Sequence, residues 1–268
     1  MSDAYAAIAE ADIGLQKRLI EVLELRGNDS QQADMRRAFL ADIDLPRDAR
    51  VLEVGCGSGV VTRTLAERPE VREVVGIDPS PLFLRHARGL AGEDGKTRFL
   101  EGDGRALDFP DASFDAVVMY TVLCHVPEPE KAISEAGRVL RPGGVLAVFD
   151  GDYAARSVAS GAFDPLQSAI EAGNSALVHD AWIMRRLPSL IQQAGLEPAR
   201  FRSYGYAAIA EPSYMLTLVD RGSDALQAAG LAGAALVAAL KAEARERVAA
   251  GRFFGQIIYN SLIATKRG

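Results

Sequence analysis

A hydrophobic strand followed by a glycine-rich turn constrains the fold of this chain most strongly. The strand Val51–Val54 leads into Gly55, Gly57 and Gly59, which stand at alternate positions before a helix expected over 60–67. Glycine lets the backbone bend sharply, and without Cβ atoms a ligand can lie against the chain beside the N-terminus of a helix. The segment therefore predicts a ligand-binding turn at the end of a buried strand.

Apolar runs alternate with helical segments between residues 50 and 150. Their Val, Ile and Leu residues are nearly continuous, which is typical of strands covered by helices on both faces of a parallel sheet. The runs are Val51–Val54, Val74–Ile77, Thr97–Leu100, Ala116–Met119 and Val145–Phe149. Two later strands are expected, near 200–206 and over 256–264. The sequence therefore predicts an α/β fold with a seven-stranded, mostly parallel sheet.

Helical segments flank these strands. Apolar residues at helical spacing predict one helix before Arg26 and a second over 30–43, and further helices are expected over 183–194 and 213–250. The segment 151–181 contains loop signals and no obvious strand, so it is expected to be an insertion. No internal repeat or low-complexity linker divides the chain, which predicts a single domain over residues 1–268.

Composition is that of an ordinary globular protein, with 49% hydrophobic and 25% charged residues. Acidic residues outnumber basic ones by 36 to 30, and the resulting charge of −6 argues weakly against a nucleic-acid partner. Cys56 and Cys124 are too few for a disulfide framework or a zinc site, so no metal and a cytoplasmic location are expected. The most membrane-like stretch, 225–240, is short and interrupted by Gly230 and Gly233, which predicts no membrane insertion.

Acidic residues recur at the ends of successive expected strands. Asp78 ends the second strand, and its two oxygens can accept hydrogen bonds from both hydroxyls of a ribose. Glu53 precedes the glycine turn and Asp103 follows the third strand. Each acid has a structural alternative as a turn cap, a helix cap or a surface residue, but their joint order favours a ligand site. The turn is not a dinucleotide fingerprint, because the position three after Gly57 is Val60 rather than glycine or alanine.

The pattern Glu53-x-Gly55-x-Gly57-x-Gly59 closely resembles the S-adenosylmethionine (SAM) motif of class I methyltransferases. The segments 109–119 and 138–144 resemble the central strands of that family and the turn before its fifth strand, so the resemblance spans residues 48–150. It implies a Rossmann-like sheet whose last strand is antiparallel. The order of elements resembles the branch of ubiquinone/menaquinone-type and natural-product methyltransferases.

The resemblance also implies roles for particular residues. The acid before the turn serves the methionine ammonium of SAM, the acid after the second strand binds the ribose, and the acid after the third receives the adenine amino group. The residues assigned to the cofactor in this way are Glu53, Gly55, Cys56, Gly57, Asp78, Pro79, Gly102, Asp103, Gly104 and Tyr120. The reaction product is S-adenosylhomocysteine (SAH).

Acceptor and catalytic residues are expected beside the cofactor. His125, just past the fourth strand, is a general-base candidate, and packing beside the cofactor is the alternative ranked first. Tyr5, Tyr153, His179, Trp182 and Arg185 are candidates for the acceptor pocket, although Trp182 can equally be core and Arg185 a solvated helix start. Residues 1–45 are expected to form a helical lid over the core 46–150 or, alternatively, to cover the sheet. The insertions 151–182 and 207–255 are expected to shape the acceptor site.

The predicted reaction is methyl transfer to an oxygen, nitrogen or carbon of a small molecule by in-line displacement, with proximity doing most of the catalytic work. Nucleic-acid base methylation is disfavoured because no Asn/Asp-Pro-Pro-aromatic motif follows the fourth strand. The alternatives are a SAM-binding protein that catalyses another reaction and an NAD-dependent oxidoreductase. A homodimer stays open.

Overall fold

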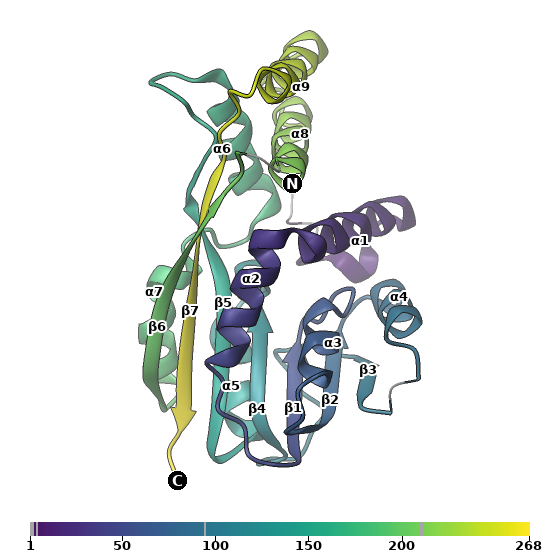
Figure 1. The fold of residues 1–268 in the computed structure, drawn as a ribbon, viewed down its shortest axis with the longest axis vertical. Coiled ribbons are helices and arrows are strands. Elements are labelled where there is room, and N and C mark those ends of the chain that lie inside the picture. Colours follow the sequence, from purple (N-terminus) through teal and green to yellow (C-terminus); the bar gives the residue numbers. More distant parts are fainter. Residues whose placement is uncertain (1–2, 4, 94, 210–211) are drawn as a thin grey trace.

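One seven-stranded sheet organises the computed structural model, which describes residues 3, 5–93, 95–209 and 212–268. The strand order is β3-β2-β1-β4-β5-β7-β6 (Figure 1). β7 runs antiparallel to β5 and to β6, and the other neighbours are parallel. The strands are β1 (Ala49–Val54), β2 (Val71–Asp78), β3 (Thr97–Glu101), β4 (Phe114–Tyr120), β5 (Leu140–Ser157), β6 (Leu196–Ala207) and β7 (Gln256–Lys266). The predicted Rossmann-like sheet with an antiparallel last strand is confirmed.

The helices begin where local capping groups satisfy their first N–H groups. The Asp29 side chain accepts a hydrogen bond from Gln32 at the start of α2, and Ser80 and Asp164 cap α4 and α6 ahead of a proline at the first helical position. The helices are α1 (Ile13–Asn28), α2 (Ser30–Ala41), α3 (Val60–Ala66), α4 (Pro81–Ala91), α5 (Pro129–Val139), α6 (Pro165–Leu177), α7 (Ile183–Gln193), α8 (Ser213–Ala228) and α9 (Ala234–Ala249), with short 3₁₀ turns η1 (Ile8–Glu10) and η2 (Leu123–His125).

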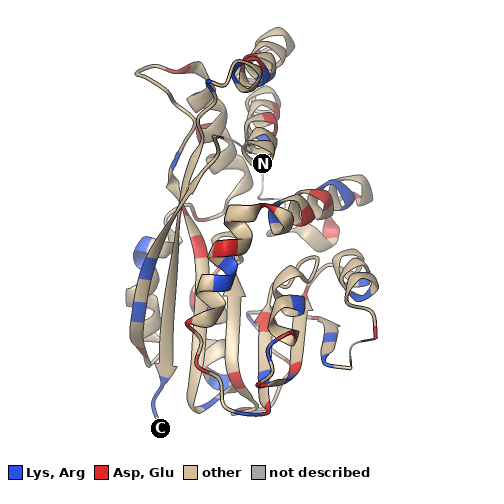
Figure 2. Ribbon diagram, in the orientation of Figure 1, with Lys and Arg blue, Asp and Glu red and all other residues tan. Residues whose placement is uncertain are grey.

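Both faces of the central strands are buried, which explains their continuous apolar runs. Along β4, Ala116 and Val118 belong to one core cluster, and Val117 and Met119 belong to the other. Helices α2 and α3 contribute to the first cluster, and α5 and α7 contribute to the second. Figure 2 shows β4 and β7 almost without charged residues along their length. Successive side chains of a strand point to opposite faces, so both sets must be apolar.

The prediction that the segment 151–181 contains no strand is wrong. β5 continues to Ser157, and its added part pairs with β7 from Asp150↔Asn260 to Ser157↔Gln256. A short strand with mixed polar residues gains its stability from the partner that completes its hydrogen bonds, and that partner lies about a hundred residues further along the chain. β6 is likewise longer than the predicted 200–206, because it pairs along β7 from Leu196 to Ala207.

The expected long helix over 213–250 is two helices. α8 ends at Ala228 and α9 begins at Ala234, and the turn between them contains Gly230 at φ +71°. Glycine adopts this left-handed conformation without the strain of a Cβ, so the break falls where the sequence offers glycine. No helix in the described ranges is long and apolar enough to span a bilayer.

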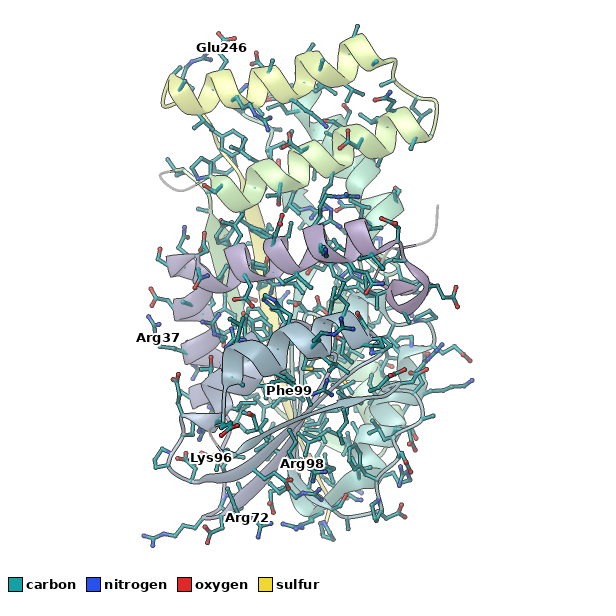
Figure 3. All side chains as sticks on the ribbon, turned by 90° about the vertical axis from the view of Figure 1, so that its right-hand side faces the viewer. Arg37, Arg72, Lys96, Arg98, Phe99 and Glu246 are labelled. Carbon is teal, nitrogen blue, oxygen red and sulfur yellow. The ribbon has the colours of Figure 1, made fainter. Side chains whose placement is uncertain are left out.

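Helices α6, α8 and α9 form a cap on the extended ends of β5, β6 and β7 (Figure 1). Figure 3 shows α9, α8 and α1 stacked one above another, with Glu246 of α9 at one end of the molecule and Arg72 and Arg98 of the sheet at the other. Within the cap, α6 and α8 approach so closely that a Cβ at Gly222 would overlap the carbonyl oxygen of Ala169. The cap therefore depends on a backbone contact that only glycine permits.

We predict that Gly222→Ala destabilises the protein by about 1–3 kcal/mol or more, because the new methyl group forces α8 away from α6. The free energy of unfolding from urea titration measures the effect. Gly89→Ala is the matched control, since its Cβ meets nothing within 4 Å on helix α4. Equal stabilities of the two variants would contradict the close approach.

Candidate active site

A large cavity lies at the carboxyl ends of β1, β2, β3 and β4, beneath helices α1, α2, α6 and α8. Its volume is about 1680 Å³ with the open mouth included. Its lining contains every residue predicted for the cofactor: Glu53, Gly55, Cys56, Gly57, Asp78, Pro79, Gly102, Asp103, Gly104 and Tyr120. Parallel strands that end at one edge of the sheet bring these separated segments together.

Gly55 and Gly104, two glycines of the lining, stand where a side chain would collide with neighbouring residues. Gly55 has φ +70°, and a Cβ there would overlap the Val122 side chain. A Cβ at Gly104 would lie 2.5 Å from Cγ1 of Val54. Gly59, at φ +81°, is the residue from which α3 begins. The turn is thus a bare backbone surface next to a helix N-terminus, as the sequence predicts.

The Glu53 carboxyl group is buried at the end of β1. Its residue is 2% exposed, and the Thr62 hydroxyl donates a hydrogen bond to Oε2. Burial raises the pKa of Glu53 from 4.5 to about 8, and the nearby Asp78 charge adds to the rise. A cation placed against this group would favour its ionised form, so the site is suited to an ammonium.

Asp78, at the end of β2, is tied to the turn. Its Oδ2 accepts from the Gly57 N–H at 3.0 Å and its Oδ1 from the Ser80 N–H at 2.9 Å. Burial raises the pKa of Asp78 to about 6 despite these two bonds. An ionised carboxylate has about four acceptor positions, so two remain for hydroxyl donors.

Asp103 differs from the other two acids because it is partly exposed and paired. The Arg105 guanidinium donates to both of its oxygens, with Nη2 2.7 Å from Oδ2. These hydrogen bonds lower the pKa of Asp103, so it stays charged at neutral pH. The three acids lie on the sheet side of the cavity.

His125 lies in the lining and contacts a residue from the other end of the chain. Its Nδ1 is 2.6 Å from Oδ2 of Asp3, and its ring lies 4.5 Å from that of Tyr5. The same Asp3 oxygen accepts from the His179 N–H at 2.9 Å. Asp3 therefore fastens the N-terminal segment over the cavity. Nothing in the sequence indicates this pair, because 122 residues separate its members.

The five residues predicted for the acceptor divide into two groups. Tyr5 and Tyr153 line the cavity, but His179, Trp182 and Arg185 are not among its lining residues. Trp182 is 53% exposed, and the Arg185 guanidinium lies 4.3 Å from its ring and pairs with Asp152. The expectation that these three form the pocket is therefore not met in this arrangement. Helix α7 buries Ile183 and Leu187 against the opposite face of the sheet, which carries its first turn away from the cavity.

Several lining residues went unrecognised in the sequence. They come from the helices and from the added part of β5: Arg26, Gln32, Arg36, Arg156, Tyr214 and Arg221. The Arg26 guanidinium lies 5.3 Å from the Tyr120 ring and donates to the Thr121 hydroxyl at 2.8 Å. The sequence does not set these residues apart, because α1 and α2 carry several other charged residues and Arg156 lies in the unpredicted part of β5. Among the described residues, no group of three metal-ligating side chains is found.

A parallel sheet with acids at the ends of β1, β2 and β3 around a glycine-lined cavity defines a Rossmann-like protein that binds a nucleoside with a cationic group. Residues 52–148 match a family model described as a methyltransferase domain. Demethylmenaquinone methyltransferase of Thermus thermophilus is 36% identical over 65% of this chain and 72% of its own length. The chain belongs to the class I SAM-dependent methyltransferases.

Solved structures share the fold at lower identity. A Bacillus halodurans C-125 protein, described provisionally as a methyltransferase, has a TM-score of 0.63 at 23% identity, over 87% of this chain and 99% of its own. The [4+2]-cyclase SpnF has a TM-score of 0.57 at 24% identity, over 90% and 85%. Other curated methyltransferases are matched over 27% to 56% of their own length. These similarities therefore do not identify the acceptor, which has to be inferred from the residues of the site.

We predict that stability of the ligand-free protein falls as pH rises from 4.5 to 8, and that Glu53→Gln removes roughly 4 kcal/mol of this fall. The pKa of Glu53 is higher in the folded protein than the 4.5 of an exposed glutamate. Its contribution is therefore fully present below pH 4.5 and is lost as pH rises through about 8. Urea titrations across this range measure the difference between variant and wild type.

Glu246→Gln, on the exposed surface of α9 (Figure 3), is the matched control and leaves the pH dependence as in the wild type. A Glu53→Gln variant with the wild-type pH dependence would show that this carboxyl group ionises freely in the folded protein.

Proposed function

We propose that the protein transfers the methyl group of SAM to a small-molecule acceptor held in the cavity beneath α1, α6 and α8. The observation that carries the proposal is the meeting of Glu53, Asp78 and Asp103 around one bare glycine turn. When bound, SAM supplies a methyl group already activated by its sulfonium. The protein then has to place the acceptor and exclude water.

The residues present fit this cofactor. The buried Glu53 carboxyl, with its pKa raised to about 8, would take the methionine ammonium, directly or through water. Asp78 would accept the ribose hydroxyls with its remaining lone pairs. Asp103 would receive the adenine amino group beside Gly102 and Gly104. The helix start after Gly59 would direct backbone N–H groups toward a ligand at this turn.

The cavity continues beyond the residues proposed for the cofactor, toward the helices of the cap. Its further part is lined by Tyr5, Tyr153, Leu177, Tyr214 and Leu218. A small organic acceptor therefore fits between these side chains and the cofactor site, which agrees with the small acceptor named for the Thermus relative.

His125 would accept the acceptor's proton where the acceptor must lose one. The Asp3 carboxylate, 2.6 Å from Nδ1, orients the imidazole and leaves Nε2 as the proton-accepting atom. The N-terminal segment would thus both close the cavity and complete the base. Four expectations stay predictions: a lid formed by residues 1–45, a cytoplasmic location, a homodimer and the lack of a nucleic-acid partner.

We expect Asp78→Ala to weaken SAH binding by about 100-fold, because two charge-assisted hydrogen bonds to the ribose are lost. Isothermal titration calorimetry with SAH measures the change. Asp108→Ala, on the exposed loop after β3, is the matched control and keeps the wild-type affinity. Unchanged affinity of Asp78→Ala, or binding of NAD in place of SAH by the wild type, would contradict the proposal.

We expect Asp3→Asn to lower kcat about 10- to 100-fold with little change in the SAM KM, because the imidazole loses the carboxylate that fixes its tautomer and orientation. Release of SAH with a panel of hydroquinones and aromatic acids gives the rates. A variant that raises KM alone would show that Asp3 only fastens the segment. Asp12→Asn, at the cap of α1, is the control for a change in a nearby N-terminal carboxylate.

SAH binding without turnover of any acceptor would favour a reaction other than methyl transfer.

A further inference from the structure

Five arginines line the cavity, and apart from Arg105, which pairs with Asp103, none forms an ion pair with a carboxylate in the described part of the chain. The other four are Arg26, Arg36, Arg156 and Arg221. Arginines elsewhere in the fold commonly pair with acids, as Arg138 does with Glu135 and Arg247 does with Asp164. Burying a positive charge without a counter-charge costs free energy, so these four arginines are expected to pair with an anionic ligand.

Two of these arginines lie beside the cofactor turn. Arg26 donates to the Thr121 hydroxyl at 2.8 Å, and Arg36 donates to the Gly27 carbonyl oxygen at 3.2 Å. Gly27 itself packs against Val60 at the start of α3. The carboxylate of a methionine group bound at this turn would lie in the same part of the cavity. Arg26 and Arg36 can therefore donate hydrogen bonds to the carboxylate of the cofactor.

Arg156 lies at the other end, where the added part of β5 meets the cap. It is 5% exposed, and its Nη2 donates to the Asn174 side chain of α6, but its Nε has no hydrogen-bond partner. The guanidinium carbon lies 5.4 Å from the centre of the Tyr153 ring. A buried guanidinium with a free donor in the cavity lining is a strong anion-binding group.

Arg221 is held close to Arg156 by the contact between α6 and α8. A Cβ on Gly173 would lie 3.5 Å from the Gly222 Cα and 3.7 Å from Nη2 of Arg156. Arg221 precedes Gly222 on α8, and its guanidinium carbon is 5.8 Å from the Tyr5 ring centre. Burial lowers the pKa of Arg156, and the neighbouring positive charge of Arg221 lowers it further, although nearby tyrosines oppose the shift.

We propose that Arg156 and Arg221 bind an anionic group of the acceptor, a carboxylate or a phosphate, while the apolar body of the acceptor lies along Leu177, Tyr214 and Leu218 toward the cofactor site. The inference rests on the proposed function, because it assigns the acceptor to this cavity. The acids of the lining, Glu53, Asp78 and Asp103, all lie at the strand ends where the cofactor is expected. Among the described residues that line the cap end, a cationic acceptor would meet two arginines and no carboxylate.

The test titrates SAH-loaded protein with three probes of similar size: 3-phenylpropanoate, phenyl phosphate and the neutral 3-phenylpropanamide. The expected result is binding of at least one anion about tenfold more tightly than the amide. The preferred anion tells a carboxylate acceptor from a phosphate one. Binding of the amide as tight as that of both anions, or no binding of either anion at millimolar concentration, would overturn the proposal.

Single-residue variants assign the effect to the two arginines. Arg221→Gln, at a half-buried position, is expected to weaken binding of the preferred anion about tenfold and to leave the SAH affinity within about twofold of wild type. Arg156→Gln is expected to give the same result, provided that the variant folds. SAH binding shows whether it does. Arg252→Gln removes an equal charge from an exposed position outside the cavity and is the matched control.

The outcomes separate this inference from the function on which it rests. A wild type that fails to bind SAH would remove the proposed function. If the wild type binds SAH but Arg221→Gln binds the anion as tightly as the wild type does, the anion site alone is overturned. The proposed function then stands.

Discussion

The parallel pairing of β1 with β2 and β4 is the constraint on which the site depends. Its register places Val54 opposite Ile77 on one side and Met119 on the other, so the next residues of all three strands emerge at one edge. Glu53, Asp78 and Tyr120 thereby meet around the glycine turn. A slip by one residue would turn each of these side chains to the other face of the sheet.

This placement also sets the electrostatics of the site. Glu53 and Asp78 are buried, and the cost of burying a charge raises the pKa of each, to about 8 and about 6. Because both carboxyl groups are buried, a cation beside Glu53 or hydroxyl donors beside Asp78 would favour their ionised forms. Asp103, which is exposed and paired with Arg105, keeps its charge. The strand ends thus offer acids in two states, suited to different parts of one ligand.

The opposite end of the cavity depends on the antiparallel strand β7. By pairing with β5 as far as Ser157, it carries Arg156 beyond the sheet core and supports the cap of α6, α8 and α9. The close approach of Gly173 and Gly222 then brings Arg221 alongside. The acids of the lining lie where the strands end, and Arg156 and Arg221 lie where the cap closes the cavity, which is the basis of the proposed division between cofactor and acceptor.

The sequence by itself determined the features that local chemistry controls. The apolar runs predicted the strands of the core, the glycines predicted the turn, and the resemblance to class I methyltransferases predicted a set of cofactor residues, all of which line one cavity. Only the tertiary structure decided what depends on distant partners. Ser157 is in a strand because Gln256 pairs with it, His125 meets Asp3 across 122 residues, and Trp182 lies outside the cavity because α7 packs on the far face. Periodicity and turn chemistry act over a few residues, whereas strand pairing, ion pairs and the facing of helices are fixed only when the chain closes on itself.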